Sequence, residues 1–252
     1  MMGPFPTHDM HVHSTFSDGQ ATIGENVVRA IALGLDELTL VDHVRVGTDW
    51  VPQFVGAVNE LRGRLPLRLS IGVEAKILSV DGSLDLPEIL DGIDHVYIAD
   101  HQVPGPDGPL HPNDVREAIA TGAVEASQVV EWIVDGTVNA MLGRRGSVLA
   151  HLFSVLPKIG LDEGAVSDDQ IRWLASTARH TDTTIEVSER WRCPGARTVA
   201  AFAEAGARIV VSTDSHALDT LGRYTWCRTT WEQAEHLLAH PNGRSVHRAA
   251  MI

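Results

Sequence analysis

Residues 22–43 read TIGENVVRAIALGLDELTLVDH and contain one complete helix–strand unit. Apolar residues recur at helical spacing from Thr22 to Leu33, and Gly34 stands where a C-terminal glycine cap is expected. The next apolar run, Glu37–His43, is rich in β-prone residues and is too short for a typical helix. The unit therefore predicts a helix that leads into a buried strand, with an Asp-His pair at the carboxyl end of that strand.

The same alternation of helix and strand continues on both sides of this unit. Further apolar, β-prone runs are Asp9–His13, Leu67–Ile77, His95–Val103, Ser147–Phe153, Thr184–Ser188 and Ala207–Thr213. Further segments with helical period are Val51–Leu65, Val124–Leu142, Asp168–Arg179 and Ala196–Ala205. Alternating elements favour a parallel sheet with helical crossovers, and near-continuous apolar strands suit a sheet covered on both faces. We predict a single domain over residues 1–252, an α/β barrel of seven strands, with an open doubly wound sheet as the alternative.

The composition limits the compartment and the partners. Of 252 residues, 44% are hydrophobic and 21% are charged, which is typical of a globular domain. Acidic residues outnumber basic ones by 33 to 20, and a net charge of −13 argues against binding of long nucleic acid. No apolar run approaches about 18 residues, so no membrane span is expected. MMGPFPTHDMHVH has neither a basic start nor an apolar core and only two cysteines occur, so we expect no signal peptide and a cytoplasmic location.

Nearly every predicted strand ends in or near side chains that can bind a metal ion. They are His11 and His13, Asp42 and His43, Glu74, His101, His151, Glu186, and Asp214 with His216. In α/β barrels the carboxyl ends of the strands form one face, so these residues should converge there. The His-x-His spacing of His11 and His13 places both imidazoles on the same side of an extended chain.

The donor types indicate which ions the site would hold. Imidazole mixed with carboxylate suits Zn²⁺, Mn²⁺ or Fe²⁺. The set is too large for one tetrahedral ion, so we expect two or three divalent metal ions with a carboxylate shared between them. Glu74 lies in an apolar run, where a buried carboxylate is costly unless a cation or hydrogen bonds compensate its charge.

These motifs together resemble those of the polymerase and histidinol phosphatase (PHP) superfamily. Asp9-Met10-His11-Val12-His13, followed by Ser17-Asp18-Gly19, is similar to the first motif, the Asp42-His43 pair to the second, and Glu74 in GVEAK to the third. His101, His151 in VLAH, Glu186 in IEVS and Asp214-Ser215-His216 resemble the others in the same order. The resemblance covers about residues 9–220 and implies a distorted (β/α)7 barrel that hydrolyses phosphate esters.

The resemblance also implies a three-metal site. His11, His13, Glu74 and Asp214 would bind the first ion, Glu74 would bridge to a second ion held by His101 and His151, and Asp18, His43 and His216 would bind the third. Catalysis would depend on Glu74, Asp214 and His216, with a hydroxide that bridges two ions as the nucleophile. For Asp18 the alternative is that Ser-Asp-Gly only turns the chain before a helix.

An anionic substrate also needs cationic partners. Arg190 and Arg192 follow the sixth predicted strand, Arg45 follows the second, and Lys76 lies two residues after Glu74. The guanidinium fork suits phosphate oxygens, so we predict that these four side chains bind a small anionic substrate. The alternative for each is a surface cation in a loop. The sequence does not indicate the oligomeric state.

The chain between His101 and His151 is longer than a crossover requires. We therefore predict a helical insertion at about 104–146 that could form a lid or a substrate wall. Its first part, Gln102–Pro112, is rich in turn formers and predicts a loop.

Four functions fit this sequence. The favoured one is a phosphomonoesterase acting on a small phosphorylated metabolite. A phosphodiesterase acting on a nucleotide would use the same metals, as would a hydrolase of an amide or ester bond. The fourth is a non-catalytic, metal-stabilised module, against which the full set of motifs argues.

Overall fold

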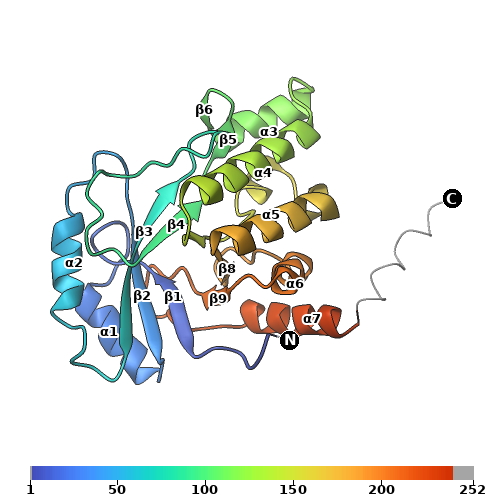
Figure 1. Ribbon diagram of the computed structural model, residues 1–252. Coiled ribbons are helices and arrows are strands. Elements are labelled where there is room, and N and C mark those ends of the chain that lie inside the picture. Colours follow the sequence, from blue (N-terminus) through green and yellow to red (C-terminus); the bar gives the residue numbers. More distant parts are fainter. Residues whose placement is uncertain (1, 241–252) are drawn as a thin grey trace.

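The computed structural model describes residues 2–240 (Figure 1). Its strands are β1 (His8–Val12), β2 (Glu37–His43), β3 (Arg68–Lys76), β4 (His95–Ala99), β5 (Val103–Gly105), β6 (Gly108–Leu110), β7 (Val148–Leu149), β8 (Thr184–Ser188) and β9 (Ile209–Ser212). Its α-helices are α1 (Ile23–Ala32), α2 (Val51–Asn59), α3 (Pro112–Thr121), α4 (Ala126–Gly143), α5 (Asp168–Thr181), α6 (Ala196–Ala205) and α7 (Trp226–Ala239). Two short 3₁₀ helices, η1 (Pro157–Ile159) and η2 (Glu163–Ala165), lie between β7 and α5.

Seven parallel strands form a nearly closed barrel. Their order is β1-β2-β3-β4-β7-β8-β9, which is also their order along the chain. A parallel bridge between Val12 and Ser215 joins the two ends of the sheet, and His13 N donates to Ser215 O at 2.9 Å. Asp9 adds a bond across the same seam by accepting from Thr213 N at 2.9 Å. The predicted seven-stranded barrel is therefore confirmed, and the open doubly wound alternative is wrong.

Helices cover the outside of the barrel. α1 begins with a capping box in which Thr22 and Glu25 satisfy each other's backbone N–H groups, and its apolar side packs into one core cluster. α4, α5, α6 and α7 lie side by side on the opposite flank (Figure 1). Because helices cover the outer face and side chains fill the interior, strands such as β2 are buried almost throughout.

The strand register determines which side chains are neighbours at the carboxyl edge. β2 and β3 pair in parallel with His43 opposite Glu74. β7 pairs with β4 and β8 only through Val148 and Leu149, so the residues after Leu149 turn across the end of the barrel. The edge is thereby crowded with the side chains that end or follow the strands.

Two strands are shorter than predicted. The expected strands ran to residues 103 and 153, but β4 ends at 99 and β7 at 149, so His101 and His151 lie in the turns beyond them. The turn after β7 is fixed by Ser154, whose N donates to His151 O at 2.9 Å and whose Oγ donates to Asp100 Oδ1 at 2.7 Å. Beyond Leu149, hydrogen bonds of the turn and of side chains thus replace the hydrogen bonds between strands.

Three other expectations need correction or refinement. The segment 102–112, predicted as a loop, contains the antiparallel hairpin β5–β6. The helix expected at 51–65 stops at Asn59, and α7 was not predicted. In the region of the predicted insertion the chain forms the hairpin, α3 and α4, and α4 packs into the largest core cluster. Within residues 2–240, no helix is long and apolar enough to cross a membrane.

Candidate metal centre

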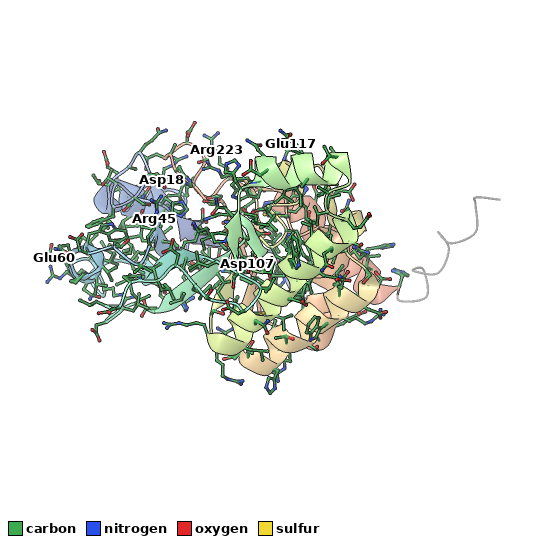
Figure 2. The ribbon with its side chains drawn as sticks, turned by 90° about the horizontal axis from the view of Figure 1, so that it is seen from above. Asp18, Arg45, Glu60, Asp107, Glu117 and Arg223 are labelled. Carbon is green, nitrogen blue, oxygen red and sulfur yellow. The ribbon has the colours of Figure 1, made fainter. Side chains whose placement is uncertain are left out.

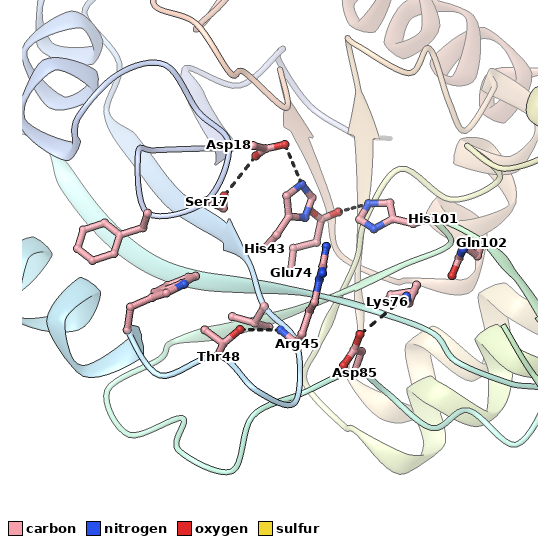
Figure 3. Close-up of a pocket in the computed structure, with 13 residues that line it drawn as sticks. Ser17, Asp18, His43, Arg45, Thr48, Glu74, Lys76, Asp85, His101 and Gln102 are labelled. Atoms are coloured by element: carbon pink, nitrogen blue, oxygen red, sulfur yellow. Dashed lines mark hydrogen bonds and ion pairs between the residues drawn. The ribbon is translucent and has the colours of Figure 1, made fainter. Parts of the chain in front are cut away.

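The nine predicted metal ligands lie together at the carboxyl ends of the barrel strands. β1 contains His11 and is followed by His13, β2 ends at His43, and β3 contains Glu74. His101 follows β4, His151 follows β7, and Asp214 and His216 follow β9. Asp18 comes from the loop before α1. Figure 3 shows the part of this cluster that faces a pocket. Residues distant in the sequence are therefore neighbours, as the barrel topology requires.

Glu74 lies at the centre of the cluster and is almost fully buried. Its Oε1 is 2.8 Å from Nε2 of His151 and 3.0 Å from Nε2 of His101. Its Oε2 is 2.8 Å from Nδ1 of His43 and 3.5 Å from Nε2 of His11. The two carboxylate oxygens thus face different imidazoles, which is the arrangement that a bridging carboxylate needs.

A second part of the cluster surrounds His13. Its Nε2 is 3.0 Å from Asp214 Oδ1, and its Nδ1 is 3.6 Å from Asp18 Oδ1. Asp18 also lies 3.6 Å from Nε2 of His43 and 3.3 Å from Nε2 of His216. The side chain of Asp18 is 55% exposed, so this part forms the mouth of the site (Figure 2).

Three groups of donors have ligand atoms within 4.8 Å of one another. They are His13, Asp18, His43 and His216; His11, His13 and Asp214; and His43, Glu74 and His101. His13 and His43 each belong to two groups, so the groups overlap with the three predicted ligand sets without being identical to them. His151 joins the third group through its contact with Glu74.

The hydrogen bonding of the donor atoms shows whether metal ions fit this cluster. Within the part of the chain that the structure describes, six buried atoms of the cluster have no hydrogen-bond partner: His11 Nε2, His13 Nδ1 and Nε2, Glu74 Oε2, His151 Nδ1 and Asp214 Oδ1. Each such atom would cost about 1–3 kcal/mol if it stayed unsatisfied. Divalent cations would satisfy the lone pairs in this set, one on each neutral imidazole and those of the carboxylate oxygens, and the mixture of imidazole and carboxylate suits zinc, manganese or iron. The residues therefore fit a multinuclear metal site.

The electrostatics of the cluster also favour cations. Burial opposes charge on His151, but the neighbouring buried carboxylates of Asp100 and Glu74 raise its pKa to about 10. Burial likewise opposes charge on Glu74, yet the imidazoles of His101 and His11 hold its pKa well below the usual range. Burial lowers the pKa of His13 to about 4, so at neutral pH this imidazole offers a lone pair. The carboxylates thus attract positive charge, which divalent ions supply while the imidazoles stay neutral.

Two neighbouring side chains orient the predicted ligands. Nδ1 of His11 is 2.9 Å from Oε2 of the buried Glu186, which leaves Nε2 directed toward Glu74. Trp191 Nε1 donates to Asp214 Oδ2 at 2.5 Å, and the other oxygen of Asp214 faces the cluster. Partners of this kind fix the tautomer and the orientation of metal ligands.

The sequence analysis missed three side chains at this site: Asp100, Trp191 and Lys158. Asp100 Oδ1 lies 3.6 Å from Nδ1 of His151, and Lys158 Nζ lies 4.2 Å from the centroid of the Trp191 ring. The position of Asp100 beside His101 at a strand end was a usable signal. Trp191 comes from the turn after β8 and Lys158 from η1, and the paths of these segments depend on tertiary contacts, so no local pattern indicates them.

The loop that carries Asp18 is held by Asp42. This buried carboxylate accepts from Ser14 N at 3.0 Å and from Ser14 Oγ at 2.6 Å. A Cβ atom on Gly19 would lie 2.6 Å from the carbonyl carbon of His13, so only glycine allows the loop to fold back this closely. The loop therefore brings Asp18 to the cluster and does more than turn the chain.

The backbone around the cluster is strained. Among the described non-glycine residues, five have positive φ, and three of these are His151 (28°), Arg192 (52°) and Asp214 (47°). Such conformations cost on the order of 1–3 kcal/mol each and gather at functional sites. Their coincidence with two predicted ligands is independent support for a functional centre.

Three of the four predicted substrate-binding cations lie beside the cluster. Arg190 Nη1 is 2.5 Å from Nδ1 of His216. Arg45 and Lys76 line the pocket that opens from the cluster (Figure 3). Arg192 is exposed, and its guanidinium makes no hydrogen bond or ion pair with any residue of the range 2–240.

The barrel and its donor set define the class of protein: an α/β barrel whose strand ends carry a cluster of His, Asp and Glu side chains that fits metal ions. Within this class, residues 9–188 match the model of the family described as "PHP domain". The chain therefore belongs to the PHP domain family, as the motifs of the sequence predicted.

Two solved structures share this fold. One is the histidinol phosphate phosphatase of Lactococcus lactis subsp. lactis Il1403, complexed with zinc, L-histidinol and phosphate, with a TM-score of 0.67, 17% identity and coverage of 94% of both chains. The other is a putative histidinol phosphatase from Listeria monocytogenes, with a TM-score of 0.64, 15% identity and coverage of 86% of this chain and 97% of that one.

One curated relative aligns along most of the chain. It is the DNA polymerase/3'-5' exonuclease PolX of Bacillus subtilis (strain 168), which is 25% identical over 244 residues. The alignment covers 94% of this chain but only 39% of the relative. The two proteins are thus similar over less than half of the length of PolX.

Proposed function

We propose that this PHP-domain protein is a phosphomonoesterase that acts on a small phosphorylated metabolite with two or three divalent ions at the cluster. The observation that carries the proposal is the position of Glu74, buried among five imidazoles with its two oxygens facing different donors. Arg190 contacts the cluster, and Arg45 and Lys76 line the pocket that opens from it, so cations are available to an anionic substrate.

The ions, when bound, would lower the pKa of water to give a nucleophile at neutral pH and neutralise charge on the phosphoryl oxygens. The residues of the chain hold and orient them. Glu74 would contribute one oxygen to the side of His101 and His151 and the other to the side of His43 and His11. Asp214, held by Trp191, would serve with His13.

The contact between Arg190 and His216 suggests how the guanidinium becomes available to substrate. A guanidinium only donates, so His216 Nδ1 accepts in this contact and Nε2 carries the proton. If Nε2 instead serves as a metal ligand, Nδ1 carries the proton and can donate to Asp214 O, which is 3.0 Å away. Arg190 then loses its acceptor on His216 and can turn to an anion above the cluster.

A phosphodiesterase is the second candidate, because the aligned relative is named a 3'-5' exonuclease. The same donors would serve that reaction. The net charge of −13 disfavours a long nucleic acid, so a mononucleotide diester is the form of this candidate that we consider.

The test is a hydrolysis assay on purified protein loaded with Mn²⁺ or Zn²⁺. We expect turnover of p-nitrophenyl phosphate and of small phosphate monoesters, among them histidinol phosphate because a structural neighbour binds histidinol and phosphate. Faster turnover of bis(p-nitrophenyl) phosphate would favour the diesterase. If the protein hydrolyses p-nitrophenyl acetate or an anilide but no phosphate ester, both the phosphomonoesterase and the phosphodiesterase are wrong, and the reaction is hydrolysis of a non-phosphate bond.

Arg190→Ala is expected to lower kcat/KM for phosphate monoesters by about ten- to a hundredfold, since a charge-assisted hydrogen bond contributes roughly 1.5–3 kcal/mol. Arg190→Lys should recover only part of this loss because lysine lacks the planar fork. Metal content should not change. Steady-state kinetics and elemental analysis of both variants measure the effect.

Two further arginines serve as comparisons for the kinetics of Arg190→Ala. Arg172, whose guanidinium pairs with Asp169 on the surface of α5, is the matched control, and Arg172→Ala should leave kcat/KM unchanged. Arg192→Ala should have a smaller effect than Arg190→Ala because its guanidinium has no contact with the cluster. Equal kinetics in wild type and Arg190→Ala would show that Arg190 does not bind the phosphate.

A further inference from the structure

A pocket of about 570 Å³ opens directly from the metal-ligand cluster. His43, Glu74, His101 and Asp18 form its inner wall, and Figure 3 shows these side chains together with the rest of the lining. The volume is within the range of about 300–1,000 Å³ that small-molecule sites occupy. A substrate whose phosphate lies at the cluster would therefore extend its organic part into this pocket.

One wall of the pocket carries two cations and one carboxylate. Arg45 and Lys76 both line it, and the acidic residue beside them is Asp85. Lys76 Nζ lies 3.8 Å from Asp85 Oδ2, whereas the guanidinium of Arg45 makes no ion pair with any residue between 2 and 240. Two cations with one carboxylate leave a surplus positive charge, in a chain that is strongly acidic and contains only two lysines.

This cationic wall is built into the barrel edge. Asp85 Oδ1 accepts from Val46 N at 2.9 Å, and Asp85 N donates to Lys76 O at 3.0 Å, so one residue ties both cation-bearing segments together. Arg45 N donates to Thr48 Oγ1 at 2.8 Å and fixes the turn after β2. The backbone positions of the two cations are therefore set before a ligand arrives.

The remaining wall is aromatic. Phe16 and Trp50 line the pocket, with ring centroids 5.5 Å apart, and both are half-buried. Such rings provide an apolar surface for the part of a ligand that connects two charged ends. The pocket is thus lined by metal-ligand candidates, by aromatic rings and by two cations.

We propose that this pocket selects substrates that carry a second anionic group besides the phosphate that is hydrolysed. The second group, a carboxylate or another phosphate, binds Arg45 and Lys76. The inference rests on the proposed phosphomonoesterase function and narrows its substrate class. A second pocket, of about 460 Å³, contains Arg190 and Arg223 but of the nine predicted ligands only Asp214, so it does not adjoin Glu74 and the histidines in the same way.

Matched pairs of substrates test the proposal. 3-Phosphoglycerate differs from glycerol 3-phosphate by a carboxylate, and fructose 1,6-bisphosphate differs from fructose 6-phosphate by a phosphate. We expect kcat/KM to be about ten- to a hundredfold higher for the doubly anionic member of at least one pair. The pair that shows the preference identifies the second anion. Calorimetric binding of 3-phosphonopropionate against propylphosphonate gives a readout that does not depend on turnover.

Variants assign the preference to the pocket. Arg45→Gln and Lys76→Gln should each lower kcat/KM for the doubly anionic member more than for the singly anionic one and so reduce the preference, whereas Arg223→Gln in the other pocket should leave the preference intact. Equal rates within both pairs, or a preference lost only in Arg223→Gln, would overturn the inference while the esterase function stands. Failure to hydrolyse any phosphate ester, with no tighter binding of 3-phosphonopropionate, would instead remove the proposed function on which it rests.

Discussion

Glu74→Gln is expected to lower kcat/KM for phosphate monoesters by on the order of a thousandfold or more, about 4 kcal/mol of transition-state stabilisation. The variant keeps the shape of the side chain but loses its charge and one of its two acceptor oxygens. Because these oxygens face His101 and His151 on one side and His43 and His11 on the other, no other residue can replace the bridge. Elemental analysis should show fewer ions per chain than in the wild type.

Thermal unfolding separates a bridging role from a structural one. Glu74→Gln removes a buried carboxylate that the surrounding imidazoles stabilise in its charged form, so the metal-free variant should be less stable than the metal-free wild type. The additional stabilisation by added metal should also shrink, and this difference between the metal-loaded and metal-free melting temperatures reports the bridging role. Glu163 is the matched control, since it is a partly buried glutamate that accepts from Gly195 N at 2.7 Å, outside the cluster. Glu163→Gln should retain activity and metal content. Full activity of Glu74→Gln would show that Glu74 does not bridge metal ions and is only a hydrogen-bonded carboxylate in a strand.

The convergence of the cluster could be predicted because it depends on topology rather than on detailed packing. In a barrel of parallel strands all carboxyl ends meet at one face, so His43 at the end of β2 and Asp214 after β9 must lie near each other whatever the loops do. The buried position of Glu74 followed from the apolar run around it. These conclusions needed only the strand pattern and the side-chain types.

Tertiary packing determined what the sequence could not predict. β7 has only two residues because the turn at His151 takes the chain out of the sheet, and no local pattern marks such a turn in an apolar run. The hairpin β5–β6 forms in a segment whose prolines and glycines indicate only a loop. α7 has a weak apolar face and was overlooked for that reason.

The substrate-binding residues show the same limit. Arg190 and Arg192 are equivalent in sequence because both follow β8, yet only Arg190 contacts the cluster. The chain reverses after β8, where Arg192 N donates to Ser188 O at 3.0 Å and Arg192 has positive φ. Proximity along the chain therefore identified the loop but could not identify which side chain faces the site.

Removal of the bound metal ions is expected to abolish hydrolysis and to lower the melting temperature by about 5–10 °C. Ligands present at about a hundred times their dissociation constant stabilise the folded state by roughly 2.7 kcal/mol, and 1 kcal/mol corresponds to about 2–4 °C for a domain of this size. The physical reason is local: His11, His13 and Asp214 bury lone pairs that cations would satisfy. Dialysis against a chelator followed by calorimetry measures the change.

Reconstitution with Mn²⁺ or Zn²⁺ should then restore both the hydrolytic activity and the melting temperature, and the restored protein should contain more than one ion per chain. The exposed pair His236 and His240, four residues apart at the C-terminal end of α7, can bind metal adventitiously and would inflate the count. The measurement is therefore repeated in His240→Ala, which removes that pair and should still bind more than one ion. A stoichiometry of one or less in this variant, unchanged at saturating metal, would contradict the multinuclear site and leave Glu74 without two ions to bridge.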